Sequence, residues 1–106
     1  MSILQCIFKE EYKKIELLVE NGADINEKNI YGDTLLHFAV LKSNNNLAKL
    51  LLKHGANVNG KNNNGTTPLH SSLDVSTSKL LLKSGGNVNE KNGNGCTPLH
   101  YAADIC

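Results

Sequence analysis

The chain has 106 residues, about one domain, and its 11 basic residues nearly balance its 10 acidic ones, giving a net charge of +1. Every basic residue is a lysine, so the planar fork that contacts phosphate or guanine bidentately is missing. Together these features argue against nucleic acid or a membrane surface as the partner. No stretch approaches the ~20 apolar residues of a membrane span.

Cys6, Cys96 and Cys106 are odd in number and lack the spacing of metal ligands. A disulfide framework is therefore not expected, and the cysteines are interpreted as small buried hydrophobic residues in a reducing compartment. We predict a cytoplasmic location, with the nucleus as an alternative.

The first predicted elements are two helices, at about residues 2–9 and 13–20. The second ends in Leu17-Leu18-Val19-Glu20-Asn21-Gly22. An apolar run closed by glycine is typical of a helix followed by a left-handed residue.

The next unit begins with Gly32-Asp33-Thr34-Leu35-Leu36-His37. Its glycine suits a tight turn with positive φ, and its threonine suits a helix N-cap. Helices are predicted at about 35–42 and 47–53, the second ending before Gly55. Helical spacing predicts these core residues: Leu36, Ala39, Val40, Leu47, Ala48, Leu51 and Leu52.

Two later units begin with Gly65-Thr66-Thr67-Pro68-Leu69-His70 and Gly95-Cys96-Thr97-Pro98-Leu99-His100, with proline at the first helical position. The earlier one is three residues short before Leu80, so we expect a missing helical turn and the least stable unit. In that unit, Thr77 and Ser78 occupy two positions that usually hold apolar residues, unless Val75 shifts into that place. The last unit stops at Cys106 after one helix. This predicts a fragment, a truncated gene product or part of a longer array, or else self-association through the uncapped C-terminal face.

The glycine-closed phrase recurs at Gly22, Gly55 and Gly85, at intervals of 33 and 30 residues, in register with the helix-start phrase. Self-similarity at this period indicates a stacked repeat array. Both phrases, including the Thr-Pro-Leu-His start, resemble those of the ankyrin-repeat family over nearly the whole chain. The resemblance implies an all-α fold with short β-hairpin fingers, that is, an ankyrin-repeat solenoid of stacked helix-turn-helix units.

The chain is accordingly expected to be a single array over residues 1–106. We divide it into a degenerate N-terminal repeat (1–28), a full repeat (29–61), a shortened repeat (62–91) and an incomplete C-terminal repeat (92–106). The family uses its recurring histidine in a structural hydrogen-bond network, which implies this role for His37, His70 and His100. Stacked layers would hold them about 10 Å apart, too far to share a metal ion.

No nucleophile elbow, phosphate loop or cluster of His, Cys and carboxylate side chains is present in the sequence. We expect no catalytic residues, no metal and no cofactor. The predicted function is a non-enzymatic protein–protein interaction module or scaffold that binds an unidentified protein on the concave face of the stack. The alternative is the targeting segment of a larger enzyme or toxin that continues beyond residue 106.

Positions that vary in the family supply the predicted partner-binding residues: Lys28, Ile30, Tyr31, Asp33, Leu41, Lys42, Lys61, Asn63, Asn64, Thr66, Asp74, Val75, Lys91 and Asn94. Ile30, Tyr31 and Leu41, with Phe38 as a possible member, are interpreted as an apolar cluster for a partner or as residues half-buried between repeats. Lys28, Lys61 and Lys91 hold one repeat position. They would form a lysine ladder that steers an acidic segment, or a solvated surface.

The resemblance also implies a modification. Ankyrin repeats are substrates of 2-oxoglutarate-dependent asparaginyl hydroxylases, at an asparagine that follows a leucine by eight residues. The pairs that match are Leu18/Asn26, Leu51/Asn59 and Leu81/Asn89. Asn26, Asn59 and Asn89 are therefore predicted as possible hydroxylation sites.

Overall fold

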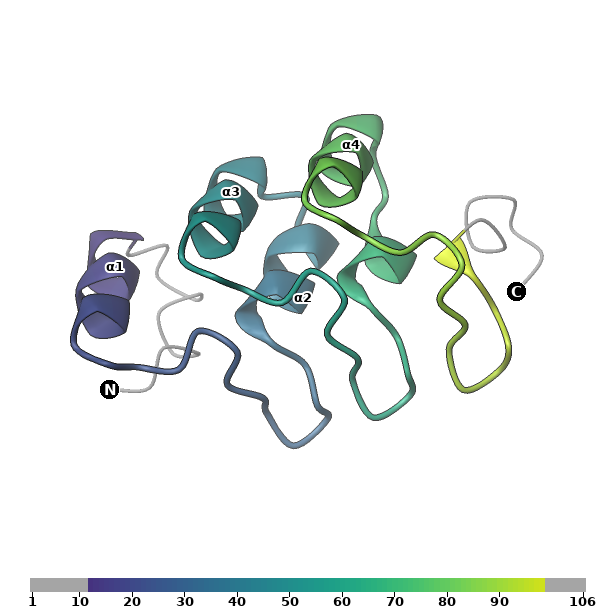
Figure 1. Cartoon of the computed structure of the whole chain (residues 1–106), viewed down its shortest axis with the longest axis horizontal. Helices are drawn as coiled ribbons and strands as arrows, with labels where there is room; N and C mark the ends of the chain where they lie inside the picture. The colour runs from purple at the N-terminus through teal and green to yellow at the C-terminus, as the bar shows by residue number, and fades with distance from the viewer. Residues whose placement is uncertain (1–11, 99–106) are drawn as a thin grey trace.

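The computed structural model describes residues 12–98, which form a row of helical layers with loops projecting from one side (Figure 1). In chain order the helices are α1 (Tyr12–Glu20), α2 (Leu35–Leu41), α3 (Asn45–Lys53), the 3-10 helix η2 (Pro68–Ser71) and α4 (Val75–Lys83). The molecule is elongated, with extents of 41 × 27 × 22 Å.

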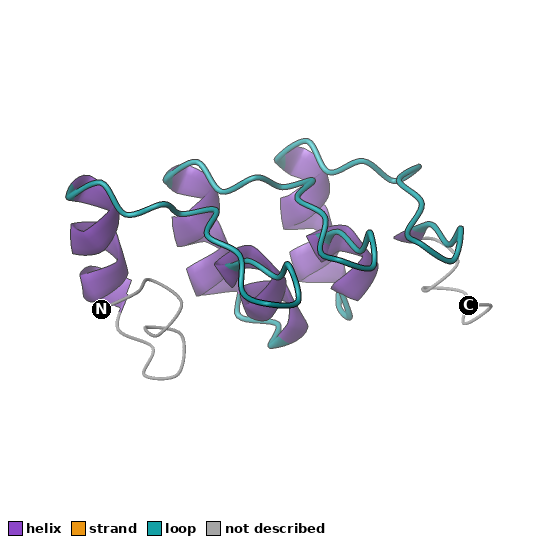
Figure 2. Cartoon of the chain, turned by 90° about the horizontal axis from the view of Figure 1, so that it is seen from below, coloured by secondary structure: helices purple, strands orange, loops and turns teal. Residues whose placement is uncertain are grey.

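The helices lie in two rows. Figure 1 shows α1, α3 and α4 along one edge and α2 and η2 in a second row between them and the projecting loops. Figure 2, seen from below, shows the same order of layers. We call α2 and η2 the inner helices, and the loops around residues 29–33, 62–66 and 92–96 the fingers. The first two fingers carry the chain into the starts of α2 and η2.

Side-chain caps fix where the helices begin. Thr34 precedes α2, and its hydroxyl accepts a hydrogen bond from the His37 amide at 3.5 Å. Asn44 and Asp74 cap α3 and α4 in the same way, at 3.1 and 2.8 Å. The N-cap predicted at Thr34 is confirmed. Hydrogen bonds from Thr77 lower the pKa of the exposed Asp74, because they favour its carboxylate form.

The core lies between the two rows of helices. Every core residue predicted at the second unit is buried except Leu52, which is partly buried against the same cluster. Ile15 of α1 and Leu81 of α4 extend this core into the neighbouring layers. The core is therefore continuous along the stack, as expected where each layer buries its apolar face only on its neighbours.

The third unit lacks a helical turn, as the sequence predicts. Its inner helix η2 has 4 residues against 7 in α2. The side chain of Thr77 is fully buried, and its hydroxyl donates to Asn45 Oδ1 at 2.7 Å. Val75 is 70% exposed, so it does not shift into the core position.

The fingers are turns closed by asparagine side chains, and none of the residues from 12 to 98 lies in a strand. In the first finger, Asn29 Oδ1 accepts from the amides of Tyr31 and Asp33 at 2.9 and 3.0 Å. Asn62 and Asn92 repeat both bonds in the later fingers. Backbone bonds, such as that from the Asn29 amide to the Asp33 carbonyl at 3.0 Å, add to this closure. The predicted hairpins are thus hydrogen-bonded turns rather than paired strands.

Cys96 is buried and is a disulfide-bonded cysteine. The expectation of reduced cysteines is therefore wrong for this residue. Cys6 and Cys106, the other two cysteines, lie outside the described residues. The predicted cytoplasmic location rested partly on reduced cysteines, and it stays a prediction.

Several further expectations also fall on residues outside the described range. They are the helix at residues 2–9, the role of His100 and the uncapped C-terminal face. Across residues 12–98, every helix is too short or too polar to cross a membrane.

Candidate interaction surface

Each recurring histidine within the described residues ties one repeat to the next. His37 Nδ1 accepts from the Thr34 amide at 3.1 Å and lies 3.0 Å from the Thr34 hydroxyl oxygen. Its Nε2 lies 2.9 Å from the carbonyl oxygen of Thr66, in the next finger. Since Nδ1 accepts an amide hydrogen, the ring proton is on Nε2 and donates to that carbonyl.

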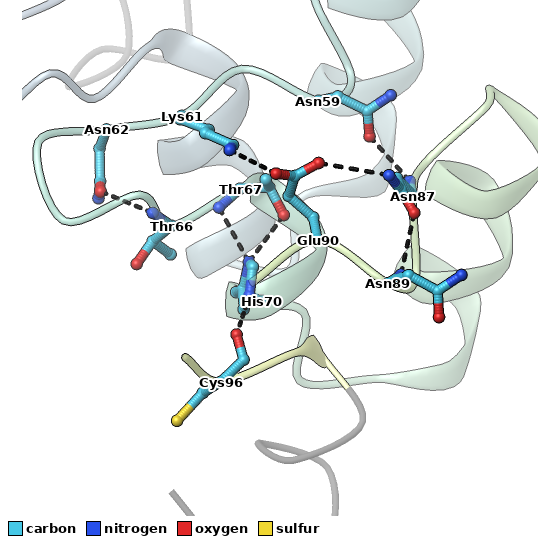
Figure 3. Close-up of polar contacts among 10 residues, drawn as sticks. All are labelled: Asn59, Lys61, Asn62, Thr66, Thr67, His70, Asn87, Asn89, Glu90 and Cys96. Atoms are coloured by element: carbon cyan, nitrogen blue, oxygen red, sulfur yellow. Dashed lines mark hydrogen bonds and ion pairs between the residues drawn. The ribbon is translucent and has the colours of Figure 1, made fainter. Parts of the chain in front are cut away.

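His70 repeats this arrangement one layer further on, as Figure 3 shows. Its Nδ1 bonds the Thr67 amide and hydroxyl, and its Nε2 lies 2.8 Å from the carbonyl oxygen of Cys96. Both ring nitrogens of each histidine are therefore engaged by the scaffold. The structural network predicted for His37 and His70 is confirmed.

The histidine network also affects protonation. Burial lowers the pKa of His37, because desolvation disfavours the imidazolium form more than the bond to Thr66 favours it.

In the described part of the chain, no group of three or more His, Cys, Asp or Glu side chains is arranged to hold a metal ion.

Backbone hydrogen bonds also join the fingers to one another. The Asn63 amide donates to the Tyr31 carbonyl at 2.9 Å, and the Gly93 amide donates to the Asn64 carbonyl at 2.6 Å. The side chain of Asn63 adds a bond to the Ile30 carbonyl at 2.9 Å. Neighbouring fingers are thereby held side by side, which leaves the fingertip side chains to face outward.

Two of the predicted hydroxylation sites bridge neighbouring repeats. Asn26 Oδ1 accepts from the Asn57 amide at 2.7 Å, and Asn59 Oδ1 accepts from the Asn87 amide at 2.8 Å (Figure 3). Asn89, at the corresponding position, is exposed. The modification itself stays a prediction.

Two lysines of the lysine ladder form contacts between repeats. Lys28 Nζ donates to the Lys61 carbonyl at 2.9 Å, and Lys61 pairs with Glu90 (Figure 3). This pairing lowers the pKa of Glu90. Lys91 is exposed. Two of the three ammonium groups are therefore directed at the next repeat, which favours a structural role for them over steering a partner.

The exposed apolar residues among the predicted site residues lie at three places. Ile30 and Tyr31, at the tip of the first finger, are 82% and 66% exposed. Leu41, on the last turn of α2, is 54% exposed, and Val75 at the start of α4 is also exposed. The proposed apolar cluster is thus divided between a fingertip and the end of an inner helix.

A pocket runs alongside α2 and also touches the second finger and the last residue of η2. It has a volume of about 150 Å³ and is lined by Asp33, His37, Phe38, Leu41, Asn62 and Ser71. Of these six, Asp33 and Leu41 were predicted as site residues, and Phe38 was named as a possible member of the apolar cluster. The sequence signal was the three-residue gap after His70, but what that gap uncovers depends on how neighbouring layers pack.

The remaining predicted residues fall into two groups. Four of them accept hydrogen bonds within the scaffold. Thr66 accepts from His37 and Asp33 accepts from Asn62. Asn64 accepts from Gly93 and Asp74 accepts from Thr77. Lys42 and Asn94 are exposed at the C-terminal end of α2 and at the third fingertip. The structure does not bring all fourteen predicted residues into one site.

A family model described as ankyrin repeats (3 copies) matches residues 3–92 of the chain. Comparison with curated proteins gave no match. The matched range contains every finger-to-finger and histidine contact described above except those that involve Cys96 and Gly93.

Proposed function

Because the chain belongs to the ankyrin-repeat family, whose repeats are generally protein-interaction modules, we propose that it is a non-enzymatic scaffold that binds a protein partner. The partner would lie on the face formed by the fingers and the inner helices, which is the concave face of such a stack. A nearly neutral chain without arginine favours a protein over nucleic acid or a membrane surface as the partner.

The exposure of Ile30 and Tyr31 supports this proposal most directly. The backbone of the first finger is held by Asn29 and by the neighbouring finger, so the scaffold does not need these two side chains. Large apolar side chains on a rigid support lose little conformational entropy on binding, and tyrosine is enriched among residues that dominate binding energy.

The experiment is affinity capture from the native source with the full chain, followed by measured affinities for the captured protein. We expect Tyr31→Ala to weaken binding about tenfold or more, because it removes an exposed aromatic anchor. Lys61→Ala should weaken it less than about threefold, since exposed ion pairs contribute little. Both variants keep the backbone bonds of their fingers, so unchanged melting curves serve as the folding control.

The reverse ranking, with Lys61→Ala the more damaging variant, would show an electrostatic interface instead. Unchanged affinity of both variants would place the partner elsewhere on the molecule and contradict the proposal.

A further inference from the structure

The pocket between α2 and η2 exists because the third repeat is short. The inner helix α2 continues to Leu41, whereas η2 ends at Ser71 and the chain leaves the layer at Ser72, whose backbone is extended. The last turn of α2 consequently has no complete neighbour, and Leu41 is left 54% exposed. Phe38 and Leu41 form the apolar part of the pocket lining.

Asp33 gives this pocket a negative charge. It is half-buried, and its Oδ1 accepts a hydrogen bond from Asn62 Nδ2 at 2.9 Å. No cation in residues 12–98 forms an ion pair with it, and the nearby Lys28 is directed at the Lys61 carbonyl instead. A partly desolvated carboxylate without a counter-ion is unusual, because burial of an unpaired charge is unfavourable.

The other polar groups of the pocket do not supply that counter-ion. His37 Nδ1 accepts the Thr34 amide, and its Nε2 donates to the Thr66 carbonyl. Asn62 donates its amide to Asp33 and uses its oxygen within its own finger. Asp33 is therefore the charged group of the pocket that is left for a ligand.

We propose that this pocket binds one arginine side chain from an extended segment of the partner protein. The inference rests on the proposed function and names the chemistry of the partner. The aliphatic stem of the arginine lies against Leu41, its guanidinium plane lies on Phe38, and its N–H groups donate to the Asp33 carboxylate.

Arginine fits this lining better than the other candidates. A volume of about 150 Å³ suits one long side chain and not a folded element. A guanidinium stacks on an aromatic ring and forms a two-point contact with a carboxylate, whereas the lysine ammonium is a strongly hydrated point charge. An apolar side chain would cover Leu41 but leave Asp33 unpaired.

The probe is N-acetyl-arginine N-methylamide, titrated into the isotope-labelled full chain and followed by amide chemical shifts. Saturable shifts are expected at residues 33, 38, 41 and 71. The matched citrulline compound has nearly the same shape without the charge, and it should bind about tenfold more weakly, since the charged hydrogen bond is lost. The lysine and leucine analogues are expected to bind more weakly than arginine.

Asp33→Asn should abolish the preference for arginine over citrulline. It keeps an oxygen for the Asn62 amide, so the fold is preserved. Glu20→Gln removes the same charge at an exposed position at the end of α1 and should leave the titration unchanged. Equal binding of arginine and citrulline, tighter binding of leucine or lysine, or no saturable shift would overturn the inference.

The inference and the proposed function fail in different ways. If a captured partner is weakened by Tyr31→Ala but not by Asp33→Asn, the scaffold function stands and the arginine pocket is wrong. If arginine binds as expected but no partner depends on Tyr31, the pocket stands and the fingertip proposal is wrong.

Discussion

At the scale of single residues, the recurring asparagines and histidines satisfy backbone groups that the short repeats cannot satisfy themselves. Asn29 closes its finger through two amides, and His37 reaches across to the Thr66 carbonyl of the next finger. These side chains add to the few backbone hydrogen bonds of the fingers, such as that from the Asn29 amide to the Asp33 carbonyl, where no strand ladder forms. Their recurrence therefore reflects the architecture and not a reaction.

The buried, neutral state of His37 predicts a pH dependence of stability. Its pKa is lowered in the folded chain from the ordinary value of 6.5, so the unfolded chain binds more protons below that pH. The free energy of unfolding should therefore be constant above about pH 6.5 with respect to this group and fall as the pH decreases below it. Urea unfolding at intervals from pH 7.5 to pH 5 measures this.

The comparison variant for this titration is His37→Gln, which has no titrating ring. It should be less stable at pH 7.5, and its stability should change less between pH 6.5 and pH 5 than that of the unchanged protein. Glu90, whose pKa is lowered from its ordinary value of 4.5, changes the free energy of unfolding only below about that pH. It therefore does not affect the comparison between pH 6.5 and pH 5. Equal slopes for the two proteins would show that His37 is not the group responsible.

At the scale of elements, the third repeat is the weak layer. Its inner helix η2 is a single 3-10 turn, and α4 places Thr77 at a buried position where apolar side chains would contribute more. The hydroxyls of Ser72 and Ser78 bond each other at 2.6 Å and the Asp74 carbonyl, so they compete for backbone groups at the start of α4.

Hydrogen exchange should show this difference directly. We expect amides of residues 71–79 to exchange faster than those of α3 under native conditions, because opening the short layer exposes fewer buried contacts. The fully formed second repeat is the internal reference. Finding residues 71–79 to be the best protected segment would contradict this interpretation.

At the scale of the whole molecule, the stack is held together by close approach of neighbouring fingers. Gly32 has φ of +79°, and a Cβ there would lie 2.7 Å from the Asn63 backbone nitrogen. Gly95 has nearly the same φ, +77°, but a Cβ there would have no atom of the described residues within 4 Å, its own chain neighbours aside. The two glycines thus share the same backbone conformation, but only Gly32 lies close to the backbone of a neighbouring finger.

Alanine at these two positions separates local strain from stacking. Gly95→Ala should cost about 1–2 kcal/mol through the left-handed backbone alone. Gly32→Ala should cost about 1–3 kcal/mol more, because the added methyl forces the second finger away from the first. Denaturant unfolding of both variants tests the difference, and equal losses would show that finger contacts contribute nothing to the stack.

Much of this architecture can be read from the sequence because it is local and repeated. Glycine at a left-handed turn, threonine at a helix N-cap and apolar residues at helical spacing each act within a few positions, and the period of 33 residues then implies stacking. On these grounds the helices at 35–42 and 47–53 and the core between them were predictable to within two residues.

The tertiary structure alone decided which surface residues remain free. Whether Lys28 and Lys61 face a partner or the next repeat depends on the spacing of layers, and they face the next repeat. Likewise, the three-residue gap after His70 is visible in the sequence. The pocket that contains Leu41 and Asp33 forms only when the short layer packs against a full one. Local interactions determine the conformation of each repeat, whereas the contacts between repeats determine which side chains remain available to a ligand.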